Sequence, residues 1–178
     1  MIYLFLAEGF EELEAAAPLD ILRRAGVQVR TVGIAGRTIT GSHGIAITCD
    51  ITPEEINRGA CEGVIFPGGP GRVNLAKSPD VLELLRIVAQ RSGMIAAICG
   101  APEILGRNGY LQGKRACCFP GSEKDLLGAE ISCDPVVTDG NVITSRGAGT
   151  AVQFALAIVE YLVSPEKAKE IAAQIQCI

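Results

Sequence analysis

The chain has 178 residues, which is enough for one domain with a substantial core, and we expect a single domain over residues 1–178. Hydrophobic residues make up 48% and charged residues 20%, as is typical of a globular protein. A net charge of −4 and an aromatic content of 4% without Trp argue against nucleic-acid binding. Apolar stretches are too short to span a membrane, and the N-terminal apolar run leads directly into Glu8 without a basic leader. We therefore expect a cytoplasmic protein that does not insert into membranes.

Cysteines are numerous and histidine is scarce. The seven cysteines are Cys49, Cys61, Cys99, Cys117, Cys118, Cys133 and Cys177. An odd number without any Cys-x-x-Cys argues against a disulfide framework and against a zinc site, so we expect reduced thiols and no metal. The only histidine is His43, which limits any cysteine–histidine chemistry.

Short apolar runs that end at turn residues predict strands, and amphipathic stretches predict helices between them. In the first half of the chain we expect a strand at 2–7, a helix at 10–24 bent or reset at Pro18, a strand at 27–34, a hairpin or edge excursion at 35–50, a helix start at 52–55 and a strand at 63–66. A helix at 78–91, a strand at 94–98, a helix at 101–107 and a strand at 114–119 follow. The chain then continues with a short helix at 123–127, a hairpin at 136–145, a long helix at 148–163 and a last helix from 164. This alternation predicts an α/β sandwich around a mainly parallel sheet.

Cys99 lies at the predicted junction of a buried strand and a helix. Small residues surround it at Ala97, Gly100 and Ala101, as a sharp nucleophile elbow requires. A thiol at this place faces the positive end of the following helix, which favours the thiolate. The alternative is a structural cysteine buried in the core.

Two further segments follow strands and are expected at the same edge of the sheet as Cys99. Residues 8–14 contain four acids after the first strand, and residues 67–71 form a Gly-rich turn whose N–H groups are free to face a ligand. Glu14 alone would be interpreted as a solvated helix residue. If it points into a pocket, burial raises its pKa and a protonated acid can donate a hydrogen bond to the sulfur. Residues 67–71 lack the spacing of a dinucleotide fingerprint, so we expect no nucleotide cofactor.

Four segments together resemble one family: Ala-Glu-Gly-Phe-Glu-Glu-Leu-Glu at 7–14, Phe-Pro-Gly-Gly at 66–69, Ala-Ala-Ile-Cys at 96–99 and Thr-Ser-Arg-Gly-Ala-Gly-Thr at 144–150. In this order and spacing the chain is similar to the ThiJ/PfpI superfamily, in the branch of the parkinsonism-associated deglycase. The resemblance implies a flavodoxin-like three-layer sandwich that forms homodimers. It places the reactive cysteine at Cys99, its carboxyl partner at Glu14 and the oxyanion-holding amides at Gly69 and Gly100.

The chain departs from the family pattern at one position. Relatives often carry a histidine just before a proline on the strand after the elbow helix, where this chain has Phe119 before Pro120. The usual cysteine–histidine dyad is therefore missing. His43 aligns with a loop that in relatives often approaches the dimer partner, and it is a candidate accessory residue, although an ordinary loop histidine is the simpler interpretation. Cys117 and Cys118 are alternative candidates for a resolving thiol, with Cys118 as a possible accessory residue, although a pair of core residues is the simpler interpretation.

Three functions compete, the first two implied by the resemblance and the third suggested by the elbow. The first is a weak glutathione-independent glyoxalase or deglycase that acts on methylglyoxal or its adducts, with Cys99 as nucleophile and Glu14 moving the proton. The second is a redox sensor or chaperone that responds to oxidants when Cys99 is converted to the sulfinate. The third, a cysteine peptidase or glutamine amidotransferase, needs a histidine base that only His43 of a dimer partner would supply.

Overall fold

The computed structural model describes residues 1–177 and contains a central six-stranded sheet. Its strands lie in the order β2–β1–β5–β6–β10–β9. Their bounds are Ile2–Leu6 for β1, Val29–Gly33 for β2, Gly63–Phe66 for β5, Met94–Ile98 for β6, Val136–Asp139 for β9 and Val142–Ser145 for β10. All neighbours are parallel except β9, which forms the predicted hairpin with β10. The mainly parallel sheet is confirmed.

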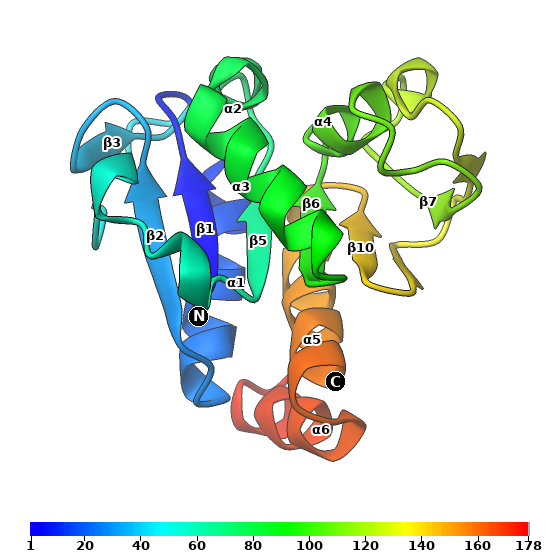
Figure 1. Ribbon diagram of the computed structural model, residues 1–178. Helices are drawn as coiled ribbons and strands as arrows, with labels where there is room; N and C mark the ends of the chain where they lie inside the picture. The colour runs from blue at the N-terminus through cyan, green and yellow to red at the C-terminus, as the bar shows by residue number, and fades with distance from the viewer. Residues whose placement is uncertain (178) are drawn as a thin grey trace.

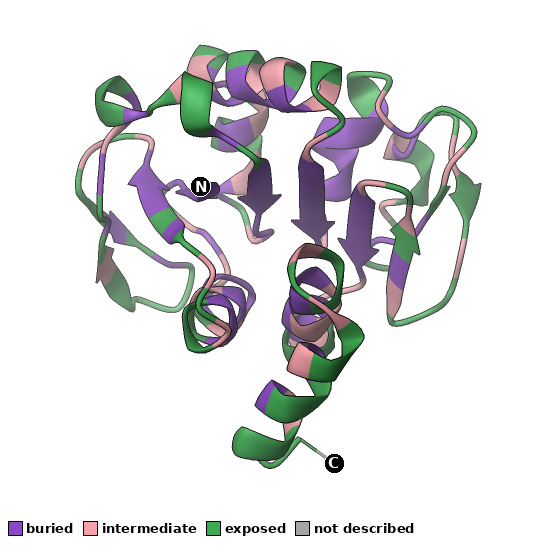
Figure 2. Cartoon of the chain, turned by 60° about the horizontal axis from the view of Figure 1, so that its bottom comes forward, coloured by how far each residue is buried: buried purple, intermediate pink, exposed green. Residues whose placement is uncertain are grey.

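Helices cover both faces of this sheet, which gives three layers (Figure 1). Three helices pack on one face: α1 (Glu12–Arg24), α5 (Ala151–Leu162) and α6 (Pro165–Gln174). The other face carries α2 (Arg72–Lys77), α3 (Pro79–Gln90) and α4 (Pro102–Arg107). The central strands are therefore buried on both sides, as Figure 2 shows, and this is why β1 and β6 consist of uninterrupted apolar residues.

Two small sheets flank the central one. The predicted hairpin at 35–50 is present as β3 (Thr38–Thr40) and β4 (Ala46–Thr48). The predicted strand at 114–119 is wrong in extent, because β7 covers only Arg115–Ala116 and pairs with β8 (Glu130–Ile131) outside the central sheet. Beyond β7 the chain turns so that the Phe119 N–H donates to the Cys99 carbonyl, and this contact replaces a strand ladder.

Other boundaries differ in ways that backbone chemistry explains. Pro18 does not reset the first helix, since α1 continues through it and buries the proline ring. The helix α2 was not predicted, because its six residues are too short to show a hydrophobic period. Ser78 caps α3 as expected, with its hydroxyl accepting from the Val81 N–H.

The remaining turns of helix are of the 3₁₀ type: η1 (Pro53–Glu55), η2 (Arg58–Ala60), η3 (Glu123–Asp125) and η4 (Ala148–Thr150). The 3₁₀ turn η4 forms the first turn of the long helix expected at 148–163, and α5 forms the rest. Within residues 1–177, no helix combines the length and the apolar character that a membrane crossing requires.

Candidate active site

Cys99 occupies the predicted elbow between β6 and α4. Its backbone has φ of +65°, a left-handed conformation that is strained for a residue with a side chain. Two hydrogen bonds hold it there: the Cys99 N–H donates to the Ser145 carbonyl at 2.9 Å, and the Cys99 carbonyl accepts from the Phe119 N–H at 2.7 Å. Ala97 and Ala101 on either side are fully buried, so the tight turn depends on small neighbours. The thiol itself remains partly exposed.

Glu14 meets Cys99 across Gly68. Glu14 belongs to the first turn of α1 and is fully buried, and its Oε2 accepts a hydrogen bond of 2.7 Å from the Gly68 N–H. A Cβ atom at Gly68 would lie 2.8 Å from that Oε2 and 3.1 Å from the Cys99 sulfur. The missing side chain of Gly68 therefore allows the carboxyl group and the sulfur to approach one another.

The buried position changes the proton affinity of Glu14. Burial raises the pKa of Glu14 to about 7, against the lowering effects of the Gly68 N–H and the Cys99 thiol, and the nearby charge of Glu11 raises it further. The expected protonated carboxyl group is therefore available up to neutral pH.

The pKa of Cys99 does not follow the sequence-based expectation. Burial and the negative charge of Glu14 raise the pKa of the thiol to about 12, although the amides of Gly100 and Gly69 lower it. The expected thiolate-favouring helix end is weak, because α4 has only six residues and desolvation outweighs it. The Glu14 carboxylate raises the pKa of Cys99, whereas the hydrogen bond with Cys99 lowers the pKa of Glu14, so Glu14 loses its proton first and the pair holds one proton above pH 7.

The N–H groups of Gly69 and Gly100 both interact with the Cys99 sulfur. Neither donates to a backbone carbonyl or to any other side chain within residues 1–177. Gly69 has φ of +78°, and a Cβ atom there would lie 2.6 Å from the Glu11 backbone nitrogen, so only glycine fits. Two donors are thus free to face a negative oxygen next to the sulfur.

A cavity of about 280 Å³ opens over the thiol. It is lined by Gly69, Pro70, Arg72, Cys99, Gly100, Phe119 and Ser122. Phe119 is half exposed and also lines a neighbouring cavity of about 390 Å³ next to residues 146–150. The site therefore combines a buried acid, a thiol and two amides, with an aromatic ring where the family histidine is expected.

Comparison with known proteins shows the family to which the chain belongs. The DJ-1/PfpI family model matches residues 1–161. The chain belongs to the DJ-1/PfpI family. The zebrafish Parkinson disease protein 7 homolog is 40% identical, with 94% of this chain and 92% of the relative aligned. A glutathione-independent glyoxalase from Caenorhabditis elegans is 36% identical over 90% of this chain and 87% of its own length. A deglycase from Pyrococcus abyssi is 31% identical over 83% of this chain and 90% of its own length.

Solved structures of DJ-1/PfpI proteins share the fold. Drosophila melanogaster DJ-1beta superposes with a TM-score of 0.92 at 36% identity, over 98% of this chain and 96% of that structure. Oxidized DJ-1 from Toxoplasma gondii superposes with a TM-score of 0.94 at 29% identity, over 98% of this chain and 97% of that structure. The predicted resemblance and the flavodoxin-like α/β sandwich are confirmed.

The one histidine of this DJ-1/PfpI chain lies away from the Cys99 cavity, which it does not line. His43 sits in the β3–β4 loop, and its Nδ1 lies 2.8 Å from Glu12 Oε2. Burial by itself raises the pKa of Glu12, but the hydrogen bonds from His43 outweigh burial and lower this pKa to about 2. The side-chain hydrogen bond to Glu12 in turn raises the pKa of His43. Glu11, Glu12 and His43 place donor atoms within 4.8 Å of one another. The Glu12 contacts with His43 and Ser42 explain this cluster as an anchor between α1 and the hairpin.

Cys118 is likewise apart from the site. It is 5% exposed and packs in the apolar core, where burial raises the pKa of its thiol to about 12. Its role as a resolving thiol stays a prediction.

Arg72, at the start of α2, was missed by the sequence analysis. A Cβ atom at Gly100 would lie 2.5 Å from Arg72 Nε, so the guanidinium group covers the residue next to Cys99. Its Nε also lies 3.3 Å from Glu103 Oε1. The only sequence signal is that Arg72 directly follows the Gly-rich turn at 67–71.

Proposed function

We propose that Cys99 is the nucleophile of a glutathione-independent glyoxalase or deglycase reaction on methylglyoxal and its early adducts. The observation that carries this proposal is the Glu14–Cys99 pair, which shares a proton in a buried site beside an open cavity. The names of the glyoxalase and deglycase relatives support the same reaction class.

In this reaction the sulfur adds to the aldehyde carbon of methylglyoxal, and the carbonyl oxygen becomes an alkoxide. The Gly69 and Gly100 N–H groups stabilise that oxygen, which then takes up a proton as the hemithioacetal forms. The carboxylate of Glu14 removes the proton from the former aldehyde carbon and returns one to the adjacent carbon, giving a lactoyl thioester on Cys99. Water hydrolyses the thioester, so that methylglyoxal and one water yield lactate and the free thiol.

Glu14 is suited to both halves of the proton transfer, because a pKa of about 7 allows it to hold or release a proton near neutral pH. Phe119 supplies no acid or base where relatives carry histidine. The loss of one such group lowers rates by on the order of 10²–10⁴-fold. We therefore propose slow turnover in comparison with histidine-bearing relatives.

Lactate formation from methylglyoxal by the purified protein tests this function. Cys99→Ser and Glu14→Gln are expected to reduce lactate formation to the background rate, whereas Cys133→Ser, at an exposed cysteine that does not line the Cys99 cavity, should match the wild type. A Cys99→Ser variant that turns over at the wild-type rate would exclude Cys99 as the nucleophile.

A redox-sensing role is the second candidate, in which two molecules of hydrogen peroxide convert the Cys99 thiol to the sulfinic acid and release two waters. A protonated Glu14 can donate a hydrogen bond to a sulfinate oxygen, and the Gly69 and Gly100 amides face the same sulfur. A structural relative is named as an oxidized form. After peroxide treatment, the intact mass should gain two oxygen atoms in the wild type and not in Cys99→Ala. Gain of both oxygens by Cys99→Ala would contradict this role.

We also propose a homodimer in the cytoplasm. Leu13 and Ile45 are large apolar residues that are 59% and 58% exposed. Glu12 joins the two segments that carry them, because it precedes Leu13 in α1 and hydrogen-bonds to the backbone of Ile45 and of His43. Light scattering after gel filtration should show a dimer for the wild type and a monomer for Leu13→Glu. A monomeric wild type would refute the dimer.

A further inference from the structure

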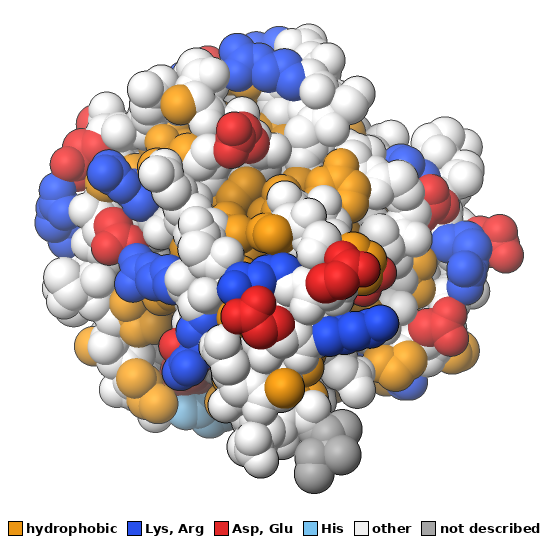
Figure 3. Space-filling model, turned by 90° about the horizontal axis from the view of Figure 1, so that it is seen from below, with side chains coloured by type: hydrophobic (Ala, Val, Ile, Leu, Met, Phe, Trp, Pro, Cys, Tyr) orange, Lys and Arg blue, Asp and Glu red, His pale blue; other side chains and the backbone are white. Residues whose placement is uncertain are grey.

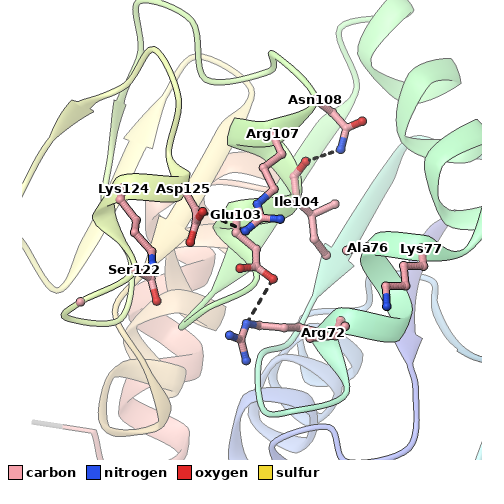
Figure 4. A pocket seen from close by; sticks show the side chains of 12 residues that line it. Arg72, Ala76, Lys77, Glu103, Ile104, Arg107, Asn108, Ser122, Lys124 and Asp125 are labelled. Atoms are coloured by element: carbon pink, nitrogen blue, oxygen red, sulfur yellow. Dashed lines mark hydrogen bonds and ion pairs between the residues drawn. The ribbon is translucent and has the colours of Figure 1, made fainter.

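A third cavity, of about 540 Å³, shares two lining residues with the Cys99 cavity. Figure 4 shows the side chains that line it. It is formed between α2, α4 and the segment around η3. The charged side chains that line it are Arg72, Lys77, Glu103, Arg107, Lys124 and Asp125. None of these residues was singled out by the sequence analysis.

Positive charge predominates in this cavity. Four of the charged side chains are cationic and two are carboxylates, an excess of two positive charges in a chain whose net charge is −4. Glu103 pairs with Arg72, and Asp125 pairs with Arg107 at 2.9 Å. Lys77 and Lys124 make no ion pair or side-chain hydrogen bond with any residue in 1–177, and both are exposed. In contrast, the end of the molecule opposite the site, seen from below in Figure 3, carries basic and acidic side chains next to each other.

Arg72 connects this cavity to the thiol, because Arg72 and Ser122 line both cavities. The guanidinium group donates to the Gly69 carbonyl at 3.2 Å and lies over Gly100. Its Nε is buried and makes no hydrogen bond within residues 1–177, since the contact with Glu103 lacks hydrogen-bond geometry. A buried guanidinium N–H without an acceptor is an unsatisfied hydrogen-bond donor, and an oxyanion can accept its hydrogen bond.

We propose that this cavity is an anion subsite that selects small carbonyl substrates carrying a phosphate or carboxylate group. Arg72 orients the anionic group next to Cys99, and Lys77 and Lys124 attract it electrostatically. Methylglyoxal is neutral and leaves this subsite unused. The proposal deepens the function given above, because it rests on Cys99 as the reacting group and names the chemical class of its substrate.

Alkylation of Cys99 with iodoacetate and iodoacetamide tests the subsite without requiring turnover. The two reagents form the same S–C bond with loss of iodide and differ only in the charge of one end. The tryptic peptide of residues 92–107 contains Cys99 as its only cysteine, so its mass reports this site alone. The measured quantity is the ratio of the iodoacetate rate constant to the iodoacetamide rate constant.

In the double variant Lys77→Met/Lys124→Met this ratio is expected to fall by on the order of tenfold, because focused fields raise encounter rates of anions by at least that amount. Both lysines are exposed, so the variant should fold. Lys169→Met, at an exposed lysine on α6, is the matched control and should keep the wild-type ratio. Arg72→Met should lower the ratio as well, and Arg72→Lys should restore part of it. An unchanged ratio in the double variant overturns the proposal.

Protection experiments distinguish the two anion types. At constant ionic strength, inorganic phosphate or acetate should slow alkylation of the wild type by iodoacetate more than that of the double variant. Protection by either anion supports the subsite, and protection by neither overturns it. If the wild type produces no lactate but its iodoacetate-to-iodoacetamide ratio still exceeds that of the double variant, the proposed turnover is refuted and the anion subsite is supported.

Discussion

The carboxyl group of Glu14 and the sulfur of Cys99 reach the same point from different layers of the fold, on either side of Gly68. Glu14 comes from the first turn of α1, and Cys99 comes from the end of β6. A single added Cβ atom at Gly68 would lie within 3.1 Å of both groups. The two groups therefore titrate together, and the reactivity of the thiol depends on the proton of the acid.

Glu14→Gln is expected to remove a pH-dependent step in Cys99 alkylation. In the wild type, Glu14 loses its proton near pH 7, and the iodoacetamide rate should rise through that pH because the carboxylate can take up the thiol proton as the sulfur reacts. The rate at the peptide of residues 92–107 should lack this step in Glu14→Gln and retain it in Glu160→Gln, an exposed acid on α5. A step that persists in Glu14→Gln would assign the titration to another group.

The same burial makes stability depend on pH. Between pH 4.5 and about 7 the native Glu14 keeps its proton while the unfolded chain has lost it, so stability falls as pH rises. At about 1.4 kcal/mol for each pH unit, the loss amounts to roughly 3 kcal/mol by neutral pH. Urea titrations at pH 5 and pH 8 give the unfolding free energies of the wild type and of Glu14→Gln. From pH 5 to pH 8, the wild type should lose about this much stability relative to the variant. A difference that is independent of pH would mean that Glu14 is ionised in the native protein at both values.

Phe119→His should increase lactate formation from methylglyoxal. Phe119 lines the Cys99 cavity and its N–H is bonded to the Cys99 carbonyl, so an imidazole there would lie beside the reacting groups. A correctly placed base contributes typically 10²–10⁴-fold, and we expect a gain of at least about tenfold in kcat. Phe119→Leu is the control for the loss of the ring alone. Equal gains in both variants would indicate a steric effect.

Gly69→Ala should be strongly destabilising in comparison with Gly44→Ala. Both glycines have left-handed backbones, with φ of +78° and +84°. A Cβ atom at Gly69 would lie 2.6 Å from the Glu11 nitrogen, whereas nothing lies within 4 Å of one at Gly44. Both variants incur backbone strain of about 1–3 kcal/mol, and Gly69→Ala adds the clash. Thermal melts should place Gly69→Ala well below Gly44→Ala, and coincident melts would show that the turn at 67–71 can shift.

The fold follows from local patterns in the sequence. Uninterrupted apolar runs such as Met94–Ile98 predict strands buried on both faces, and Ser78 and Ser164 mark helix starts that the structure retains. The strand at 114–119 was overpredicted, because Ala116 and Cys118 are buried in the hydrophobic core while only Arg115 and Ala116 pair in a ladder.

The sequence by itself determined where the elbow cysteine lies, since small residues on both sides of Cys99 and the end of an apolar run specify a strand-to-helix elbow. It also placed Glu14 and Gly69 at the same edge. Only the tertiary structure decided the electrostatics, because a pKa depends on burial and on charges brought from distant elements. Thus the expected low pKa of Cys99 was wrong. The position of Arg72 beside Gly100 and Glu103 could be recognised only from the packing of α2 against α4.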